Sequence, residues 1–261
     1  MGRIRAFEFN ENPWVPGFVR DSITETLGRA WRMSGAFGAV GDAFADFCRR
    51  SGCRVFLDLG SGSGEPVALL AEALAQRGHD SVSFILSDLF PNVPCMEKVA
   101  ARHPEVRFRP EPVDAAHVPD DLQCDAYTVL TAFHHFPPPL AAAVLADCVR
   151  RRRAIFIVDG PDLRRMLKGM PIRLMPVGAL ALFANPFLTR KDRLLKTVFT
   201  FLLPLIPLAG MWDSLVSALR FYSPSDFAAM TEGLTGDYQW EFRELKTSAG
   251  LSLNVFTGIP R

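Results

Sequence analysis

The sequence predicts an α/β fold in which a mostly parallel sheet carries crossover helices, an antiparallel hairpin at one edge and an apolar helical insertion. Residues 54–160 alternate short apolar runs with helical patterns, as strands joined by crossover helices do. Residues 161–219 interrupt this alternation with long uncharged stretches, and residues 220–261 return to it with one helix and two strands. These three observations predict one α/β unit that carries one insertion.

The composition is that of a globular protein with one sizeable core. Of 261 residues, 49% are hydrophobic and 22% are charged, and the formal net charge of +1 offers no field that would hold a nucleic acid. The five cysteines show no metal-ligand spacing, so we expect no metal site. The first residues contain no apolar signal core, which favours a cytoplasmic protein, and the sequence leaves the oligomeric state open.

Five apolar runs predict the parallel strands. The strands are expected at 54–60, 83–88, 106–113, 126–130 and 154–159, and the helices between them at 66–77, 97–103 and 140–150. Pro66 stands in the first turn of its helix, where a missing N–H costs little. The third strand contains two prolines and is the weakest of the five predictions. The arginines at 150–153 follow the last helix, where positive charge complements the helix dipole.

The end of the chain predicts one more helix and a hairpin. Ser223 and Asp226 have the spacing of a capping box, with Pro224 at the first helical position. Residues 238–246 and 252–259 alternate as strands do and are joined by a short turn at 247–250. We therefore expect residues 220–261 to add a final helix and an antiparallel edge hairpin to a core formed by residues 51–160.

The beginning of the chain predicts a helical lid over residues 1–50. Ser22 to Glu25 has the pattern of a capping box. The helix that would follow it places Ile23, Leu27 and Trp31 on one face.

The insertion, residues 161–219, combines apolar stretches with positive charge. Residues 174–189 and 197–212 carry no charge, but prolines break them and each is shorter than the roughly 20 residues that span a bilayer. From Arg164 to Lys196 there are eight basic residues and one acidic residue, hence +7, which leaves −6 for the rest of the chain. We expect an apolar helical cap that binds an apolar small molecule. Peripheral contact of residues 164–212 with an anionic membrane is the alternative.

A glycine-rich loop, Asp58-Leu59-Gly60-Ser61-Gly62-Ser63-Gly64, links the first strand to the first crossover helix. Glycines allow a tight turn there and let a ligand approach bare backbone N–H groups. Glu65 stands where a dinucleotide fingerprint has a third small residue, and no Gly-Lys-Ser/Thr follows for a phosphate-binding loop. The pattern therefore favours a ligand that has a nucleoside but no phosphate.

Two further acids follow the next two strands. Asp88 ends the second strand, where a carboxylate can accept hydrogen bonds from both ribose hydroxyls. Asp114 follows the third strand, where it can accept from an adenine amino group. Because ligands of open α/β sheets bind outside the carboxyl ends of the strands, we expect these acids and the glycine loop to converge.

On these residues the sequence resembles the class I S-adenosylmethionine-dependent methyltransferases, most strongly over residues 50–160. The segments 9–14, 87–92, 134–136 and 212–223 are also similar to an uncharacterised bacterial subgroup of that family. The resemblance implies a Rossmann-like fold with a seven-stranded sheet and S-adenosylmethionine as cofactor. It implies that the cofactor-binding residues are Asp58, Gly60, Ser61, Gly62, Gly64, Asp88, Asp114, Ala115 and Thr131, with Asp58 orienting the loop.

The segment Thr131-Ala132-Phe133-His134-His135-Phe136 matches the region of the family that flanks the reactive sulfonium and the acceptor. An alcohol or phenol acceptor needs a proton acceptor, and histidine has a suitable pKa near neutral pH. We expect His135 to be this base, with His134 as the second candidate. The alternative interpretation is that one histidine packs beside the cofactor and the other bonds to the backbone.

The expected activity is methyl transfer to a small lipophilic acceptor, with oxygen ahead of nitrogen or carbon. The alternative is a protein of the same fold that binds S-adenosylmethionine without methylating anything. Asp213 and Arg220 are expected to pair across the cap. The residues expected to face the acceptor are Trp14, Phe133, Trp212, Asp213, Arg220 and Tyr222.

Overall fold

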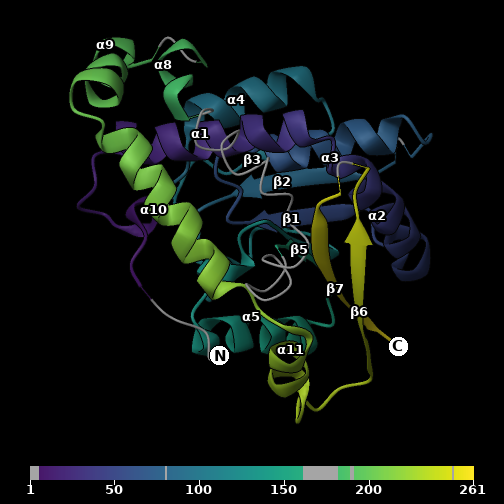
Figure 1. Cartoon of the computed structure of the whole chain (residues 1–261). Coiled ribbons are helices and arrows are strands. Elements are labelled where there is room, and N and C mark those ends of the chain that lie inside the picture. The colour runs from purple at the N-terminus through teal and green to yellow at the C-terminus, as the bar shows by residue number, and fades with distance from the viewer. Residues whose placement is uncertain (1–5, 80, 161–181, 189–190, 249) are drawn as a thin grey trace.

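The computed structural model describes residues 6–79, 81–160, 182–188, 191–248 and 250–261 (Figure 1). These residues form one seven-stranded sheet in the order β3-β2-β1-β4-β5-β7-β6. The parallel strands are β1 (Val55–Leu59), β2 (Ser83–Ser87), β3 (Val106–Phe108), β4 (Ala126–Leu130) and β5 (Ala154–Asp159). The edge hairpin is β6 (Tyr238–Lys246) and β7 (Ser252–Pro260), and β7 pairs antiparallel with β5. The predicted fold class is confirmed.

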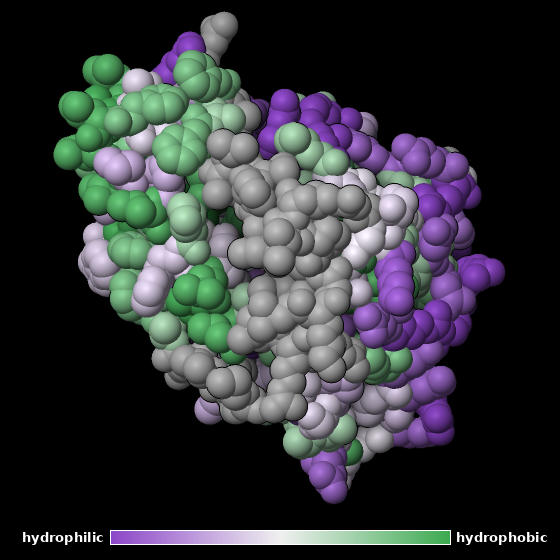
Figure 2. Space-filling view, in the orientation of Figure 1, coloured by the Kyte–Doolittle hydropathy of each residue, from purple (hydrophilic) through white to green (hydrophobic). Residues whose placement is uncertain are grey.

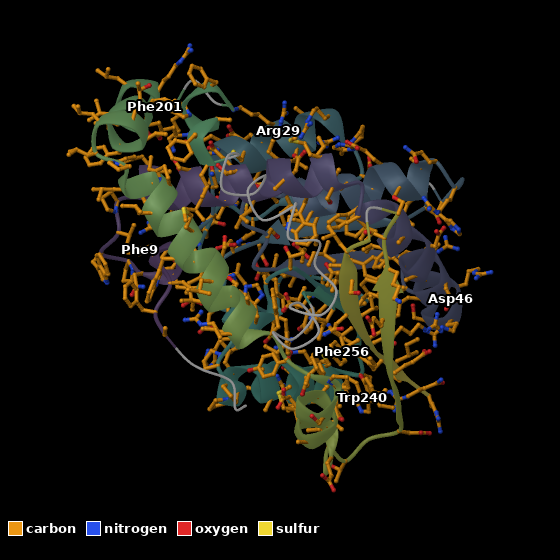
Figure 3. All side chains as sticks on the ribbon, viewed as in Figure 1. Phe9, Arg29, Asp46, Phe201, Trp240 and Phe256 are labelled. Atoms are coloured by element: carbon orange, nitrogen blue, oxygen red, sulfur yellow. The ribbon has the colours of Figure 1, made fainter. Side chains whose placement is uncertain are left out.

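Helices cover both faces of the sheet. One face carries α2 (Phe37–Ser51), α3 (Glu65–Ala75) and α4 (Val93–Arg102), and the other carries α5 (Pro138–Arg151) and α11 (Pro224–Thr231). Successive strand residues alternate between the two layers, so that Phe56 joins the first core and Leu57 the second. Phe256 of β7 stacks on Phe227 of α11, while Trp240 of β6 lies over Gly258 (Figure 3).

Among the described residues of the first 50, helix α2 belongs to the sheet core. Its Phe44 and Phe47 are fully buried and pack against Phe56 of β1 and Phe156 of β5. The segment η1 (Phe9–Glu11) lies outside that core layer, and α1 (Gly17–Ser34) reaches it through Trp31.

The predicted start of α1 is wrong, because the helix begins at Gly17, five residues before the expected capping box. Ser22 lies inside the helix, and its Oγ donates to the carbonyl of Phe18 at 2.6 Å. In contrast, the capping box of Ser223 and Asp226 at the start of α11 is present as predicted.

Other predicted boundaries shift for local reasons. Helix α4 starts at Val93 because the Asn92 side chain caps it by accepting from the Cys95 N–H. Strand β3 ends at Phe108, since Pro110 and Pro112 cannot donate to the sheet.

The described part of the insertion is helical. It contains α8 (Asn185–Leu188), α9 (Arg193–Thr197), the π-helical segment η4 (Val198–Leu202) and α10 (Leu205–Arg220), while residues 161–181 and 189–190 lie outside the described residues. No single helix among the described residues is long and apolar enough to cross a membrane. Residues 193–202 and α10 taken together have the length and composition of a membrane span, but the two parts are bent by 77° at residues 203–204. Helix α10 extends from α9 toward α5 and α11 (Figure 1).

Candidate active site

A cavity of about 760 Å³ opens at the carboxyl ends of the parallel strands. Its floor comes from the loops after β1, β2, β3 and β4, and its walls come from η1, α1 and α10. Its size lies within the roughly 300–1,000 Å³ typical of small-molecule sites. The topology therefore gathers the predicted loop, two of the predicted acids and both histidines around one space.

The glycine loop is shaped from beneath by Asp58, which is buried and does not line the cavity. Its carboxylate accepts from Ser61 Oγ and Thr128 Oγ1, each at 2.7 Å. Burial raises the pKa of Asp58 to about 7, although both hydroxyls oppose that shift. Asp58 thus supports the glycine loop through Ser61, the position in which the resemblance places it. It does not line the cavity.

Glycines of this loop have two different reasons to lack a side chain. Gly60 and Gly62 line the cavity with φ of 76° and 56°, and the nearest atoms to an added Cβ on Gly62 belong to Thr24 at 3.7 Å. Gly64 lies outside the cavity, where an added Cβ would stand 2.7 Å from Leu86 Cδ1. Gly64 therefore allows α3 to pack on the sheet, and the structure does not place it with the ligand-facing residues.

Asp88 joins the glycine loop to the end of β2. Its carboxylate accepts from the N–H of Gly62 at 2.7 Å and from the N–H of Phe90 at 2.8 Å, and it lines the cavity. A carboxylate can accept about four hydrogen bonds, so capacity remains for hydroxyls of a ligand. The loop and the acid form one unit.

The predicted adenine-binding pair and Thr131 also line the cavity. Asp114 accepts from the N–H of Ala116 at 2.9 Å, and Ala115 lines the same wall. Partial burial opposes the shift, but that N–H and His117 hold the pKa of Asp114 below its ordinary value, so it stays ionised. Thr131 adopts φ of 59°, a left-handed conformation that is rare for a β-branched residue, at the turn after β4.

His134 is oriented by the carboxylate of Asp159 at the end of β5. His134 and Asp159 are both buried. The Asp159 carboxylate accepts one hydrogen bond from the His134 ring at Nδ1 and another from the His134 backbone N–H, each at 2.8 Å. The N–H of Gly160 donates to the same carboxylate at 3.0 Å. With Nδ1–H donated to Asp159, the neutral imidazole carries its lone pair on Nε2, in a residue that lines the cavity.

His135 stands between two other carboxylates. Its Nδ1 lies 2.8 Å from Glu11 and 3.2 Å from the fully buried Glu8. Burial alone would lower the pKa of His135, but the two glutamates outweigh it and raise the pKa to about 10. His135 is therefore a cation near neutral pH, and an imidazolium has no lone pair with which to accept a proton.

Arg220 completes this ion-pair network. Its guanidinium lies 3.1 Å from Glu8 and also contacts Glu11. Burial opposes the shift, but His135 and Arg220 lower the pKa of Glu11 to about 2. Glu8, His134 and His135 approach closely enough to suit a metal ion. Two cations already balance two glutamates here, so the cluster is an ion-pair network.

Asp213 of α10 binds the same N-terminal segment. Its carboxylate accepts from the N–H groups of Phe9 at 2.7 Å and Asn10 at 3.1 Å. Burial raises the pKa of Asp213 to about 6, against the lowering effect of these two donors. The expected pair between Asp213 and Arg220 is wrong: each side chain attaches α10 separately to residues 8–11.

Of the six residues predicted to face the acceptor, Asp213 lines the cavity and the other five do not. Phe133 and Tyr222 are buried in the core beside Phe227, and Arg220 is committed to its glutamates. Trp14 is 67% exposed, and Trp212 donates from Nε1 to the Phe7 carbonyl at 2.9 Å. Aromatic or charged character alone did not identify the wall.

The wall is formed instead by helical stripes that the sequence analysis missed. On α1 they are Thr24, Leu27, Gly28 and Trp31, and on α10 they are Met211, Ser214, Leu215 and Ala218. Both sets follow the spacing i, i+3, i+4, i+7, which was the available signal. The predicted face of Ile23, Leu27 and Trp31 does lie on this wall.

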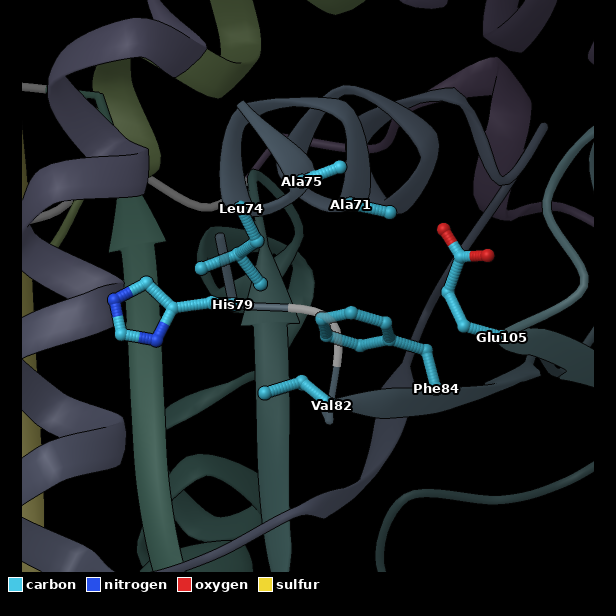
Figure 4. Close-up of a pocket in the computed structure, with 7 residues that line it drawn as sticks. All are labelled: Ala71, Leu74, Ala75, His79, Val82, Phe84 and Glu105. Atoms are coloured by element: carbon cyan, nitrogen blue, oxygen red, sulfur yellow. The ribbon is translucent and has the colours of Figure 1, made fainter. Parts of the chain in front are cut away.

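A second, smaller cavity of about 110 Å³ lies among α3, β2 and Glu105 (Figure 4). Val82 and Phe84 place it at the opposite ends of the strands from the glycine loop. Because it is small and has a mainly apolar lining, we do not assign this second cavity a role in binding or catalysis.

The chain is similar to solved methyltransferase structures. A putative O-methyltransferase from Nostoc punctiforme matches with a TM-score of 0.54 at 13% identity, over 98% of this chain and 64% of that one. The plantazolicin methyltransferase BpumL, in complex with S-adenosylhomocysteine (SAH), matches with a TM-score of 0.52 at 10% identity, over 92% and 96%. Human N-acetylserotonin methyltransferase, in complex with S-adenosylmethionine, matches with a TM-score of 0.51 at 14% identity, over 93% and 55%.

These likenesses show that the chain has the fold of class I S-adenosylmethionine-dependent methyltransferases, as its sequence predicted. The chain spans about half to two-thirds of the length of the Nostoc and human proteins. No protein-family model and no curated protein matches the sequence.

Proposed function

We propose that this protein transfers a methyl group from S-adenosylmethionine to a small apolar acceptor, with a hydroxyl oxygen as the preferred acceptor atom. The observation that carries this proposal is the single cavity that joins two kinds of surface. One side holds the glycine loop with Asp88 and Asp114, and the other holds His134 beneath an apolar wall.

The side of the cavity with the glycine loop fits S-adenosylmethionine in shape and in charge. Bare backbone at Gly60 and Gly62 faces the cavity, where any Cβ would narrow the space next to a ligand. Asp88 and Asp114 present acceptors for hydroxyl and amino groups, which a nucleoside offers. The carboxylates of Asp88 and Asp114 would repel a phosphate, and Arg20, which also lines the cavity, lies over the Phe90 ring at 4.8 Å.

The acceptor side is apolar and closes over His134. Phe136, Leu140, Met211, Leu215 and Phe221 line it, so it suits a ring or chain of carbon atoms. Phe221 lies 4.7 Å from the His134 ring, measured between centroids, and packs closely over Gly160, where no Cβ would fit. This contact places an apolar ring beside the imidazole, which would limit the access of water on that side.

S-adenosylmethionine, held by the glycine loop, Asp88 and Asp114, would supply an electrophilic methyl group on sulfur, with SAH as the leaving group. An acceptor hydroxyl that forms a bond to that methyl carbon must lose its proton, and His134 Nε2 takes the proton. Asp159 holds the ring in the tautomer that this step needs and stabilises the imidazolium that results. We therefore assign the base to His134 in place of His135, whose raised pKa keeps it protonated.

Methyl-labelled S-adenosylmethionine and a panel of apolar phenols and alcohols test this assignment. Label should enter the organic phase, and His134→Ala should lower turnover by about 10²- to 10⁴-fold, the usual contribution of a general base. Asp159→Asn should lower turnover in the same direction. Affinity for SAH should stay unchanged in His134→Ala, since the base does not hold the cofactor.

Turnover of His134→Ala at the wild-type rate would remove the base assignment. Tight SAH binding without transfer to any member of the panel would favour the alternative, a protein that binds the cofactor without methylating these acceptors.

A further inference from the structure

We propose that the surface formed by α8, α9, η4 and the outer side of α10 docks on an anionic lipid bilayer, from which an apolar acceptor enters the cavity. The docking does not depend on the proposed function, whereas the delivery of the acceptor rests on it. We call this surface the apolar face.

The apolar face carries an unusual density of exposed large hydrophobic side chains. It consists of Phe187, Leu194, Leu195, Phe201, Leu202, Leu203, Leu205, Leu208, Met211, Trp212 and Leu215. Leu194 and Leu202 are 78% and 75% exposed, so most of each side chain is in contact with solvent. Contiguous exposed apolar patches of this kind mark interaction sites in proteins.

In space these residues gather at one end of the molecule. Figure 2 shows hydrophobic surface over α8, α9 and α10, while hydrophilic surface covers the opposite side. Phe201 lies in this region and Asp46 of α2 lies far from it (Figure 3). On the face seen in Figure 2, hydrophobic and hydrophilic surface are therefore separated.

The charge of the apolar face selects lipid with anionic headgroups. No acidic residue occurs from residue 193 to residue 212. Lys191, Asp192 and Arg193 are exposed at its border, and Lys191 pairs with Asp21 of α1 at 3.0 Å. Lys196 is buried in an ion pair with Glu25 of α1 at 2.8 Å, so both lysines fix this segment to α1. Arg193 is therefore the border cation that we expect to face headgroups.

The apolar face is continuous with the mouth of the cavity. Met211 and Leu215 are 49% and 55% exposed and at the same time line the cavity. An apolar molecule dissolved in a bilayer would therefore reach the cavity past these two side chains without crossing water. A second copy of this chain seated on the same residues would cover that entrance, which is why lipid suits the surface better.

Flotation of the full chain with vesicles tests the docking. Wild-type protein should float with vesicles that contain phosphatidylcholine and phosphatidylglycerol, and less with phosphatidylcholine alone. Leu194→Glu combined with Leu202→Glu should weaken partitioning about tenfold or more, because two inserted side chains become charged. Arg193→Gln should weaken it about fivefold, the contribution of one cation near an anionic surface.

Met33→Glu is the matched control, since Met33 is 70% exposed on α1 outside the apolar face. It should float as wild type does. Failure of wild type to float with either vesicle would overturn the proposal, and so would equal loss in Met33→Glu. A wild-type dimer that the Leu194/Leu202 variant converts to monomer would assign the apolar face to a second copy instead. SAH titration of the same variants separates these outcomes from the proposed function, because the cofactor side should be unaffected.

Discussion

His134 and His135 are adjacent in the chain but contact different carboxylates. One carboxylate faces His134 and also takes two backbone N–H groups, so it sets the orientation of the ring. Two carboxylates and one guanidinium surround His135, so it serves as a cation that holds the N-terminal segment. Residue identity alone does not distinguish these roles, whereas the neighbours do.

Stability should depend on pH through His135. Its folded pKa of about 10 lies above the ordinary value of 6.5, so its stabilisation is full below about pH 6.5 and is lost as pH rises through about 10. His135→Gln should lower the free energy of unfolding by about 3 kcal/mol at pH 6, the low end for a broken buried pair. The difference from wild type should vanish above pH 10. Denaturant unfolding across this range measures it, with exposed His117→Gln as control.

A difference between His135→Gln and wild type that stays constant from pH 6 to pH 11 would contradict the assigned cation.

Asp58 should also make stability fall as pH rises, but over a lower pH range than His135. Its folded pKa of about 7 lies above the ordinary 3.8, so ionisation of this buried acid lowers stability as pH rises from about 4 to 7. Asp58→Asn should therefore gain stability relative to wild type on going from pH 5 to pH 8. Thermal unfolding at both values checks this, and a relative loss at pH 8 would show that the carboxylate is stable when ionised.

Helix α1 is an element whose position depends on one small residue. An added Cβ on Gly28 would stand 2.8 Å from both Glu65 Cβ and Ser63 Oγ, so α1 lies directly against the glycine loop. The ion pair of Arg32 with Glu72 at 2.9 Å and its contact with Glu65 hold α1 to α3. The position of α1 thus depends on its contacts with the glycine loop and α3.

Gly28→Ala should displace α1 and disturb the loop. We expect a loss of about 1–3 kcal/mol in stability, as for overpacking, together with weaker SAH binding. Gly38→Ala is the control, because nothing lies within 4 Å of its added Cβ in α2. That control should be neutral or more stable by about 0.5–1 kcal/mol, since alanine favours helix. Equal effects of the two substitutions would contradict the close approach of α1 to the loop.

Element positions in the core were predictable because local patterns specify them. Strands β4, β5 and β6 have the predicted bounds, since their apolar runs are bounded by polar or turn residues. The start of α1 was not predictable from its capping pattern. Val15, Val19 and Ile23 pack against α10, and these tertiary contacts extend α1 toward its N-terminus.

At the scale of the whole molecule, topology explains which part of the site could be predicted. Parallel strands bring their carboxyl ends together, so Gly62, Asp88 and Asp114 converge once the strand order is known. The acceptor side depends on contacts between residues 6–11 and α10, more than 200 positions apart, such as Asp213 with Phe9. No local pattern encodes those contacts, and residues such as Trp14 and Tyr222, chosen for their aromatic character, do not line the cavity.

The same contacts divide the walls of the cavity into a cover and a sheet side. Residues 8–11, α1 and α10 close the cavity as one cover, joined through Asp213, Arg220 and the buried pair of Lys196 with Glu25. The sheet supplies the opposite side with the loop and acids. Cofactor affinity should therefore depend on the sheet side, and choice of acceptor on the cover.

Calorimetric titration of the full chain with SAH tests the central claim most directly. Wild type should bind, and Asp88→Ala should bind about 10- to 1,000-fold more weakly, because charge-assisted hydrogen bonds contribute about 1.5–3 kcal/mol each. Asp42→Ala, which removes an exposed acid of α2, should bind as wild type does. Absence of wild-type binding at millimolar SAH, or Asp88→Ala binding as tightly as wild type, would contradict the account.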